Sequence, residues 1–204
     1  MKIKVWCLTL LIAMLMSACS GPAPSGDVKK LRGEYFDFAV KYRLDYMPFF
    51  SEGNAPADSV EYLYYAFAVN LENWGDDKGT MTREYVEQVI RSHFIVGEIN
   101  HKPLPRCWNY DGEKYTAVPT SIKDEPLYVL KSFDHTVENG RTIYAVTMDY
   151  CVPKQYPLDA GQYRAIRATI MAGDYSALTA IQTESFRYYA DETTGEPIFL
   201  SHTL

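Results

Sequence analysis

The pair Asn139–Gly140 is the sequence feature that most constrains the fold of this chain. Asn-Gly is strongly favoured in two-residue β-hairpin turns, because both central positions need a positive φ. Here it separates two stretches that alternate in polarity, residues 127–137 and 141–150. A two-residue turn also fixes the pairing of the strands and puts Glu138 opposite Arg141. The sequence therefore predicts a long antiparallel hairpin.

The same register sorts the side chains onto two faces. It puts Phe133 opposite Val146 and Lys131 opposite Met148. The apolar face comprises Val129, Phe133, Tyr144, Val146, Met148 and Tyr150, and the polar face comprises Ser132, Asp134, Thr147 and Asp149. Lys131 is the one charged residue on the apolar face. The pattern predicts a sheet with one buried face.

Two further turns extend this β-rich half. Asp111–Gly112 predicts a second two-residue hairpin, with Trp108 opposite Tyr115. Thr194–Gly195 leads into a final strand at residues 197–203.

Residues 162–171 fit either a helix or a strand. Tyr163, Ile166 and Ile170 have helical spacing, whereas the run from Thr169 to Met171 is typical of a strand. We favour the strand, because Gly173–Asp174 resembles a turn into the next stretch, residues 175–190.

The first part of the chain predicts helices instead. Apolar side chains recur at helical spacing from residue 31 to 46, from 60 to 74 and from 85 to 94, and Thr82 is placed to cap the third helix. Helices followed by an antiparallel meander describe an α+β fold. We expect a single domain over residues 28–204, with 28–95 mainly helical and 106–204 mainly strand.

The amino terminus has the features of an export signal. Lys2 and Lys4 precede an uncharged apolar run, Val5–Met16, which is too short to span a bilayer. We predict a signal peptide at residues 1–18 and a linker at 19–27, where Gly, Ser and Pro make an extended tether.

The sequence Met16-Ser17-Ala18-Cys19 resembles the lipobox of bacterial lipoproteins, although that family prefers Leu where Met16 stands. The resemblance implies cleavage before Cys19 and acylation of that cysteine, which would hold the protein on the cell membrane or outer membrane, outside the cytoplasm. Ordinary secretion with an incidental cysteine is the alternative.

Charge and cysteine content limit the partners and the redox chemistry. The net charge of −6 becomes about −8 once residues 1–18, with two lysines and no acid, are removed. This charge argues against binding to nucleic acid or to anionic lipid. Cys107 and Cys151 are either a disulfide, which export permits, or two free buried thiols; we favour the disulfide.

The chain contains 17 tyrosines, which suit either an aromatic core or a binding surface. The candidate binding surface comprises Trp74, Trp108, Tyr110 and Tyr115.

No catalytic, metal or cofactor motif is present in the sequence, and we predict no cofactor. The histidines His93, His101, His135 and His202 lack zinc-ligand spacing. Residues 73–84 have the length of a calcium loop but lack its central glycine. Cysteine–histidine pairs (His101 with Cys107, His135 with Cys151) are conceivable nucleophiles. The carboxylates Asp58, Glu61, Asp76, Asp77, Asp149 and Glu184 show no spacing that selects a catalytic pair.

Residues 82–203, with "WNYDGEKYTAVPTS" and "LYVLKSFDHTVENGRTIYAVTMDY", resemble in pattern the cystatin-like and NTF2-like modules of envelope lipoproteins. The resemblance implies a curved sheet packed on helices, and most such lipoproteins are not enzymes. We therefore expect a non-catalytic module that binds an envelope protein or small ligand. The alternative is a small envelope hydrolase with carboxylates in the concavity of the sheet.

Overall fold

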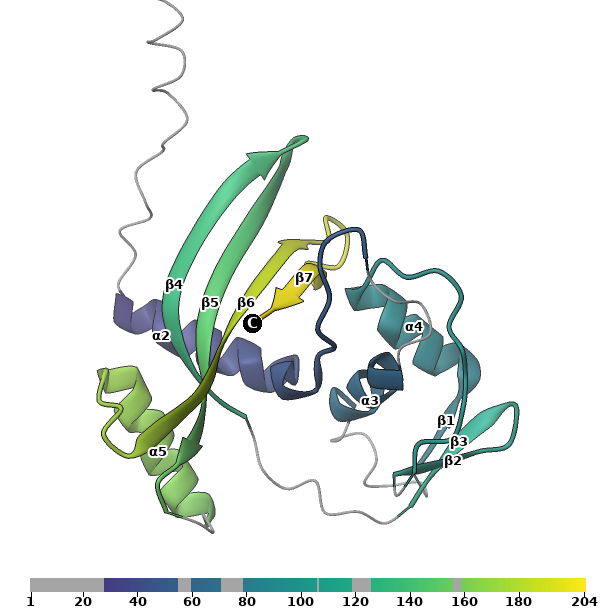
Figure 1. The fold of residues 1–204 in the computed structure, drawn as a ribbon, viewed down its shortest axis with the longest axis horizontal. Coiled ribbons are helices and arrows are strands. Elements are labelled where there is room, and N and C mark those ends of the chain that lie inside the picture. The colour runs from purple at the N-terminus through teal and green to yellow at the C-terminus, as the bar shows by residue number, and fades with distance from the viewer. Residues whose placement is uncertain (1–27, 55–59, 71–78, 106, 119–125, 156–158) are drawn as a thin grey trace, which may run out of the picture.

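The computed structural model describes residues 28–54, 60–70, 79–105, 107–118, 126–155 and 159–204 (Figure 1). The predicted signal peptide, the linker with Cys19, and Trp74 lie outside these residues. None of the described helices is long and apolar enough to cross a membrane.

The described chain has the predicted α+β composition. Its helices are α2 (Val28–Lys41), the short 3₁₀ helix η1 (Leu44–Tyr46), α3 (Val60–Ala68), α4 (Arg83–His93) and α5 (Ala160–Ala172). Its strands are β1 (Thr80–Thr82), β2 (Trp108–Tyr110), β3 (Lys114–Ala117), β4 (Leu127–Glu138), β5 (Arg141–Pro153), β6 (Leu178–Ala190) and β7 (Pro197–Thr203). The predicted cap of α4 is confirmed, because the Thr82 side chain accepts a hydrogen bond from the amide of Tyr85.

The strands form two antiparallel sheets rather than one. The large sheet has the order β4-β5-β6-β7, which is the predicted meander, and the small sheet has the order β1-β3-β2. Figure 1 shows the small sheet with α3 and α4 at one end of the molecule and the large sheet with α2 and α5 at the other.

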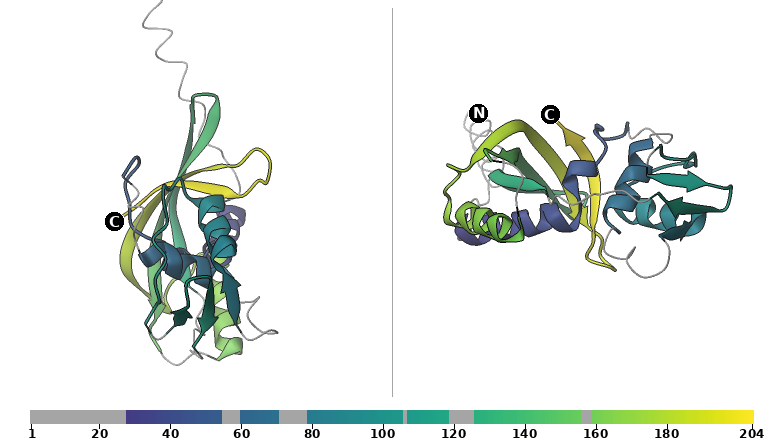
Figure 2. Two further views of the ribbon diagram at one scale, coloured as in Figure 1. Left: turned by 90° about the vertical axis from the view of Figure 1, so that its right-hand side faces the viewer. Right: turned by 90° about the horizontal axis from the view of Figure 1, so that it is seen from below.

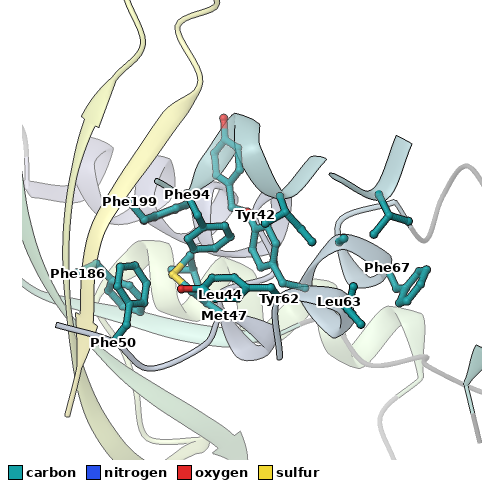
Figure 3. Close-up of a cluster of buried hydrophobic side chains, with 14 of the residues drawn as sticks. Tyr42, Leu44, Met47, Phe50, Tyr62, Leu63, Phe67, Phe94, Phe186 and Phe199 are labelled. Carbon is teal, nitrogen blue, oxygen red and sulfur yellow. The ribbon is translucent and has the colours of Figure 1, made fainter. Parts of the chain in front are cut away.

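One aromatic cluster runs through both parts. Figure 3 shows it passing from Phe186 and Phe199 of the large sheet, through Phe94 and Tyr62, to Phe67 of α3. A second, smaller cluster packs α5 against the ends of β4, β5 and β6. The continuity of the first cluster joins the two sheets into one hydrophobic core.

The predicted β4–β5 hairpin is confirmed around its turn. Asn139 and Gly140 both have positive φ, at 51° and 79°, and Glu138 pairs with Arg141 and Phe133 with Val146. A β-bulge between Leu130 and Ser132 then shifts the register by one residue, so that Tyr128 rather than Val129 pairs with Tyr150.

The bulge explains the charged residue on the apolar face. The extra residue in β4 is Lys131, which points away from the core and forms an ion pair with Asp149 at 3.0 Å. Leu130 takes the place opposite Met148 that simple counting from the turn gave to Lys131. The position predicted for Lys131 was therefore wrong by one residue.

The predicted register of the short hairpin was also wrong. Tyr110 pairs with Tyr115, and Trp108 pairs with Ala117, so the connection is longer than two residues. The Asp111 carboxylate accepts hydrogen bonds from the amides of Glu113 and Lys114, which stabilises this wider turn.

Residues 162–171 form a helix, and the strand predicted there was wrong. Asp159 and Gln162 form a capping box: the Asp159 carboxylate accepts from the Gln162 amide, and the Gln162 side chain accepts from the Asp159 amide. Gly173 ends the helix in the left-handed conformation at φ 84°. Ile166 and Ile170, one turn apart, are buried. These helix boundary signals outweigh the local strand propensity of Thr169 and Ile170.

The cap gives a direct test of this helix. Replacing Asp159 with Ala removes the acceptor for two amides and should lower the free energy of unfolding by about 1 kcal/mol. Asp159→Asn keeps a capping oxygen and should cost less. Urea denaturation followed by circular dichroism measures both, and equal stability of Asp159→Ala and the wild type would contradict the assigned cap.

The β4–β5 hairpin projects beyond the rest of the molecule as an arm. Figure 2 shows its tip standing clear of the helices and of the other strands. Every residue from Asp134 to Thr142 is exposed. Glu138, which directly precedes the turn, forms an ion pair at 2.9 Å with Arg187 of β6, and Arg187 forms a second ion pair with Glu52.

Candidate functional site

The predicted aromatic binding surface is not a surface. Trp108 is 2% exposed and Tyr115 is fully buried, so both belong to the core. Trp108 stacks on Phe67, with ring centroids 4.2 Å apart and planes within 9°. Tyr110 is half-buried and stacks on Tyr115. The prediction failed because burial of these rings depends on α3, which lies far away in the sequence; Trp74 lies outside the described residues.

The most polar part of the interior is a buried pair, Glu184 of β6 and His202 of β7. The β6–β7 register pairs Phe186 with His202, so His202 lies on the same sheet face as Glu184. His202 Nε2 is 2.9 Å from Glu184 Oε2, and both side chains are almost fully buried. Sequence reasoning named each residue but did not connect them.

Two more donors hold the Glu184 carboxylate. The Tyr128 hydroxyl donates to Oε2 at 2.7 Å, and the Gln182 amide donates to Oε1 at 2.5 Å. Burial alone would raise the pKa of Glu184, but the hydrogen bonds from His202, Gln182 and Tyr128 outweigh burial and lower it. Glu184 is therefore held as a carboxylate.

The His202 ring is fixed on all sides. Its Nδ1 lies 3.2 Å from the Pro48 carbonyl oxygen, which can only accept, so Nδ1 carries a proton. Phe186 and Phe49 stack on the ring, with centroids 4.4 Å and 4.2 Å away. Phe49 is 45% exposed and covers the pair from the outside.

An ion pair lies near the Glu184–His202 pair. Arg43 binds Asp45 through two parallel hydrogen bonds, of 3.0 Å from Nε and 2.7 Å from Nη2. Both side chains are mostly buried, and burial raises the pKa of Asp45 although Arg43 opposes the shift. Arg43 has a positive φ of 44°, an uncommon conformation for a residue other than glycine. The element η1 thereby places Asp45, whose charge is balanced by Arg43, at the edge of the Glu184 cluster.

The hydrogen bonds around Glu184 and His202 argue against a role of this pair in acid–base catalysis. Both Glu184 oxygens and both His202 nitrogens already have protein partners, so none of these atoms is directed at a substrate. Asp149 pairs with Thr183, one residue from Glu184, and therefore lies on the opposite face of the sheet. The two carboxylates cannot flank one bond. The cluster is arranged to hold β6, β7 and the segment around Pro48 together.

The lowered pKa of Glu184 predicts how stability depends on pH. A carboxyl with a depressed pKa in the folded state stabilises the protein above the pKa of the unfolded group, about 4.3, and that contribution is lost as the pH falls through the lower folded-state value. The unfolding free energy of Glu184→Gln should therefore fall less steeply below about pH 4.3 than that of the wild type. Parallel curves in urea titrations from pH 3 to 7 would contradict this assignment.

A second histidine network lies in the small-sheet region. His101 Nδ1 is 2.9 Å from the Tyr115 hydroxyl, and Nε2 is 3.0 Å from Glu87 Oε1. Glu87 also forms ion pairs with Arg83 and Arg91. Both nitrogens of His101 are therefore occupied by Tyr115 and Glu87, and the nucleophile pair with Cys107 that the sequence left open does not form.

The predicted disulfide is also absent: Cys107 and Cys151 are free thiols. Cys107 packs at the margin of the large cluster, whereas Cys151 lies in the small cluster under α5. Burial is the main cause that raises the pKa of Cys151 to about 11, so its thiol is not activated. Cys151 pairs with Leu127 at one end of β4, far from His135 near the other end.

The other acidic residues considered in the sequence analysis lie partly outside the described chain. Asp58, Asp76 and Asp77, and the first half of the residue 73–84 segment, lie outside the described residues, and Glu61 lies on α3. The second half of that segment forms β1 and the start of α4. Among the residues that the structure describes, no group of three or more histidine, cysteine or acidic side chains is arranged to hold a metal ion.

Comparison with known proteins found no match: no protein-family model, no curated protein and no solved structure matches this chain.

Proposed function

We propose that this chain is an exported lipoprotein, held on an envelope membrane by acyl chains on Cys19, whose domain binds a protein partner without catalysis. The anchor is supported by the order of features before residue 20: two lysines, a short apolar run, and small residues leading to a cysteine. Two or more acyl chains hold a protein stably on a bilayer, whereas one does so marginally.

The observation that carries the binding role is the β4–β5 arm. Its residues from Asp134 to Thr142 are all exposed, and Val137 near its tip is 71% exposed. A long exposed hairpin with an apolar residue at its tip suits contact with another protein. Ion pairs from Arg187 to Glu138 and Glu52 brace it against the body of the domain.

The hydrolase alternative has less support. Its best carboxylate, Glu184, is held by three protein donors, and Asp149 lies on the other face of the sheet. Buried polar networks of this kind, with every atom satisfied, are typical of structural elements that fix packing.

The anchor is tested by labelling cells with a fatty-acid analogue. The wild-type chain should carry label and sediment with membranes, whereas Cys19→Ala should lose the label and leave the membrane fraction. Equal labelling of the two chains would remove the anchor from the proposal.

The role of the arm is tested with a photo-cross-linking amino acid at position 137 in the full chain on membranes. We expect a discrete cross-linked protein product. The same group in place of Glu192, an exposed residue of the β6–β7 turn, is the control and should give none. Identical patterns at the two positions would contradict specific binding by the arm.

A further inference from the structure

We propose that the partner of the arm is a second copy of this chain, and that the two β4 strands pair antiparallel about a twofold axis at His135. The pairing would join two four-stranded sheets into one sheet of eight strands. This inference rests on the proposed function, because it gives the partner of the same arm.

The turn shows which backbone groups of β4 face outward. In a hairpin with a two-residue turn, the residues that flank the turn exchange hydrogen bonds, and bonded and non-bonded pairs then alternate. Glu138, Thr136 and Asp134 therefore bond to β5, and the amides and carbonyls of Val137, His135 and Phe133 point to the open edge.

Two observations agree with this assignment. The amide of His135 donates to the Asp134 carboxylate at 2.8 Å, so it is not engaged with β5. Among the described residues, no backbone hydrogen bond from outside the sheet ladder reaches residues 132–138. A long edge strand whose outward peptide groups lack backbone partners is a template for pairing with another chain. On pairing, the His135 amide would exchange the Asp134 carboxylate for a carbonyl of the second copy.

Parity and charge select the register. Residues whose peptide groups point to the open edge must lie opposite one another, so the twofold axis must pass through a residue and not between two residues. Asp134, His135 and Thr136 are the candidates, and the charges of the facing side chains distinguish them. Centring on Asp134 puts two aspartates face to face, and centring on Thr136 puts Asp134 against Glu138 twice. Centring on His135 puts Asp134 opposite Thr136 and Ser132 opposite Glu138, with no like charges opposed.

The same register matches the apolar side chains. It puts Phe133 of one chain opposite Val137 of the other, and the reverse, so the exposed Val137 would gain an aromatic neighbour. Phe133 and His135 already pack beside Tyr144 on this face. The pairing ends where β4 ceases to be regular, at the bulge by Lys131 and at the turn.

Single-cysteine substitutions along the edge test the register. Each residue from Phe133 to Val137 is changed to cysteine in the full chain, and membranes are treated with a mild thiol oxidant. Bonded antiparallel pairs have Cα atoms about 5.5 Å apart, within disulfide range, at the symmetric position only. Cross-linked dimer should therefore peak at position 135, with the wild-type chain as background.

A peak at position 134 or 136 would overturn the proposed register, whereas equal yields along the strand or no dimer would overturn the self-pairing. The cross-linker at position 137 separates this outcome from failure of the proposed function. A product with a different protein would keep the binding role and reject the second copy, whereas no product would reject both.

Thr136 offers a matched pair of variants. In the proposed register it faces Asp134 of the second copy, so Thr136→Lys adds two attractive pairs and Thr136→Asp adds two repulsive ones. The dimer yield of the cysteine variant at 135 should rise about 3- to 10-fold with lysine and fall by a similar factor with aspartate. Changes of the same sign in both variants would contradict the register.

Discussion

Replacing Glu184 with leucine is expected to lower the free energy of unfolding by about 3–5 kcal/mol, because it removes the buried acceptor that His202, Tyr128 and Gln182 share. His202 Nε2 would lose its partner at 2.9 Å, and the hydroxyl of Tyr128 would lose its acceptor. Neither group is accessible to water in the folded protein, since Glu184 and His202 are buried and Phe49 covers the ring. Urea denaturation at neutral pH measures the loss.

The double variant Glu184→Leu with His202→Leu is the control for this prediction. Replacing both partners of a buried pair with apolar residues is often far less costly than removing one. The double variant should therefore be more stable than the sum of the two single effects predicts. Additive losses would show that the two side chains act independently and would contradict the network described here.

Replacing Trp108 with alanine is expected to cost about 3–5 kcal/mol, the usual range for deleting a large aromatic side chain from a core. Trp108 is 2% exposed and stacks face to face on Phe67 of α3, so its removal would leave a cavity between α3 and the small sheet. The midpoint of thermal unfolding reports the change. It is followed by far-UV circular dichroism, because tryptophan fluorescence would itself change on removal of Trp108.

Tyr110, next but one in the sequence, is the matched control. It is half-buried and pairs with Tyr115 across the hairpin, so Tyr110→Ala should cost less than half as much. If Trp108→Ala folded with unchanged stability and instead abolished binding to a partner, the ring would belong to a surface and the packing described here would be wrong.

The parts of the fold that were predictable are those encoded by neighbouring residues. Asn139–Gly140 fixes the pairing of Phe133 with Val146 because the turn and both strands lie within one short segment. The helix at 83–93 was predictable from Thr82 and the apolar spacing that follows it. In both cases the deciding interactions are local in sequence.

The failures share a different cause. The bulge at Lys131 and the burial of Trp108 depend on packing between elements that are distant in sequence. The helix α5 was different: its capping box, Asp159 with Gln162, is visible in the sequence and carried more information than the strand propensity that we favoured.

The candidate site was the least predictable feature. Glu184 and His202 meet only because β6 and β7 shift register between Arg187 and Tyr188. Counting back from a two-residue turn at Thr194–Gly195 would put His202 beside Arg187, on the opposite face from Glu184. A single irregularity in the ladder thus decides whether the buried pair exists.

The central claim is that acyl chains on Cys19 anchor a binding domain to a membrane, outside the cytoplasm. Mass spectrometry of the amino-terminal peptide of the protein extracted from membranes tests it most directly. We predict a chain that begins at Cys19 and carries the added mass of acyl chains. A peptide that begins at Met1, or an unmodified Cys19 on protein released from the cytoplasm, would contradict the claim.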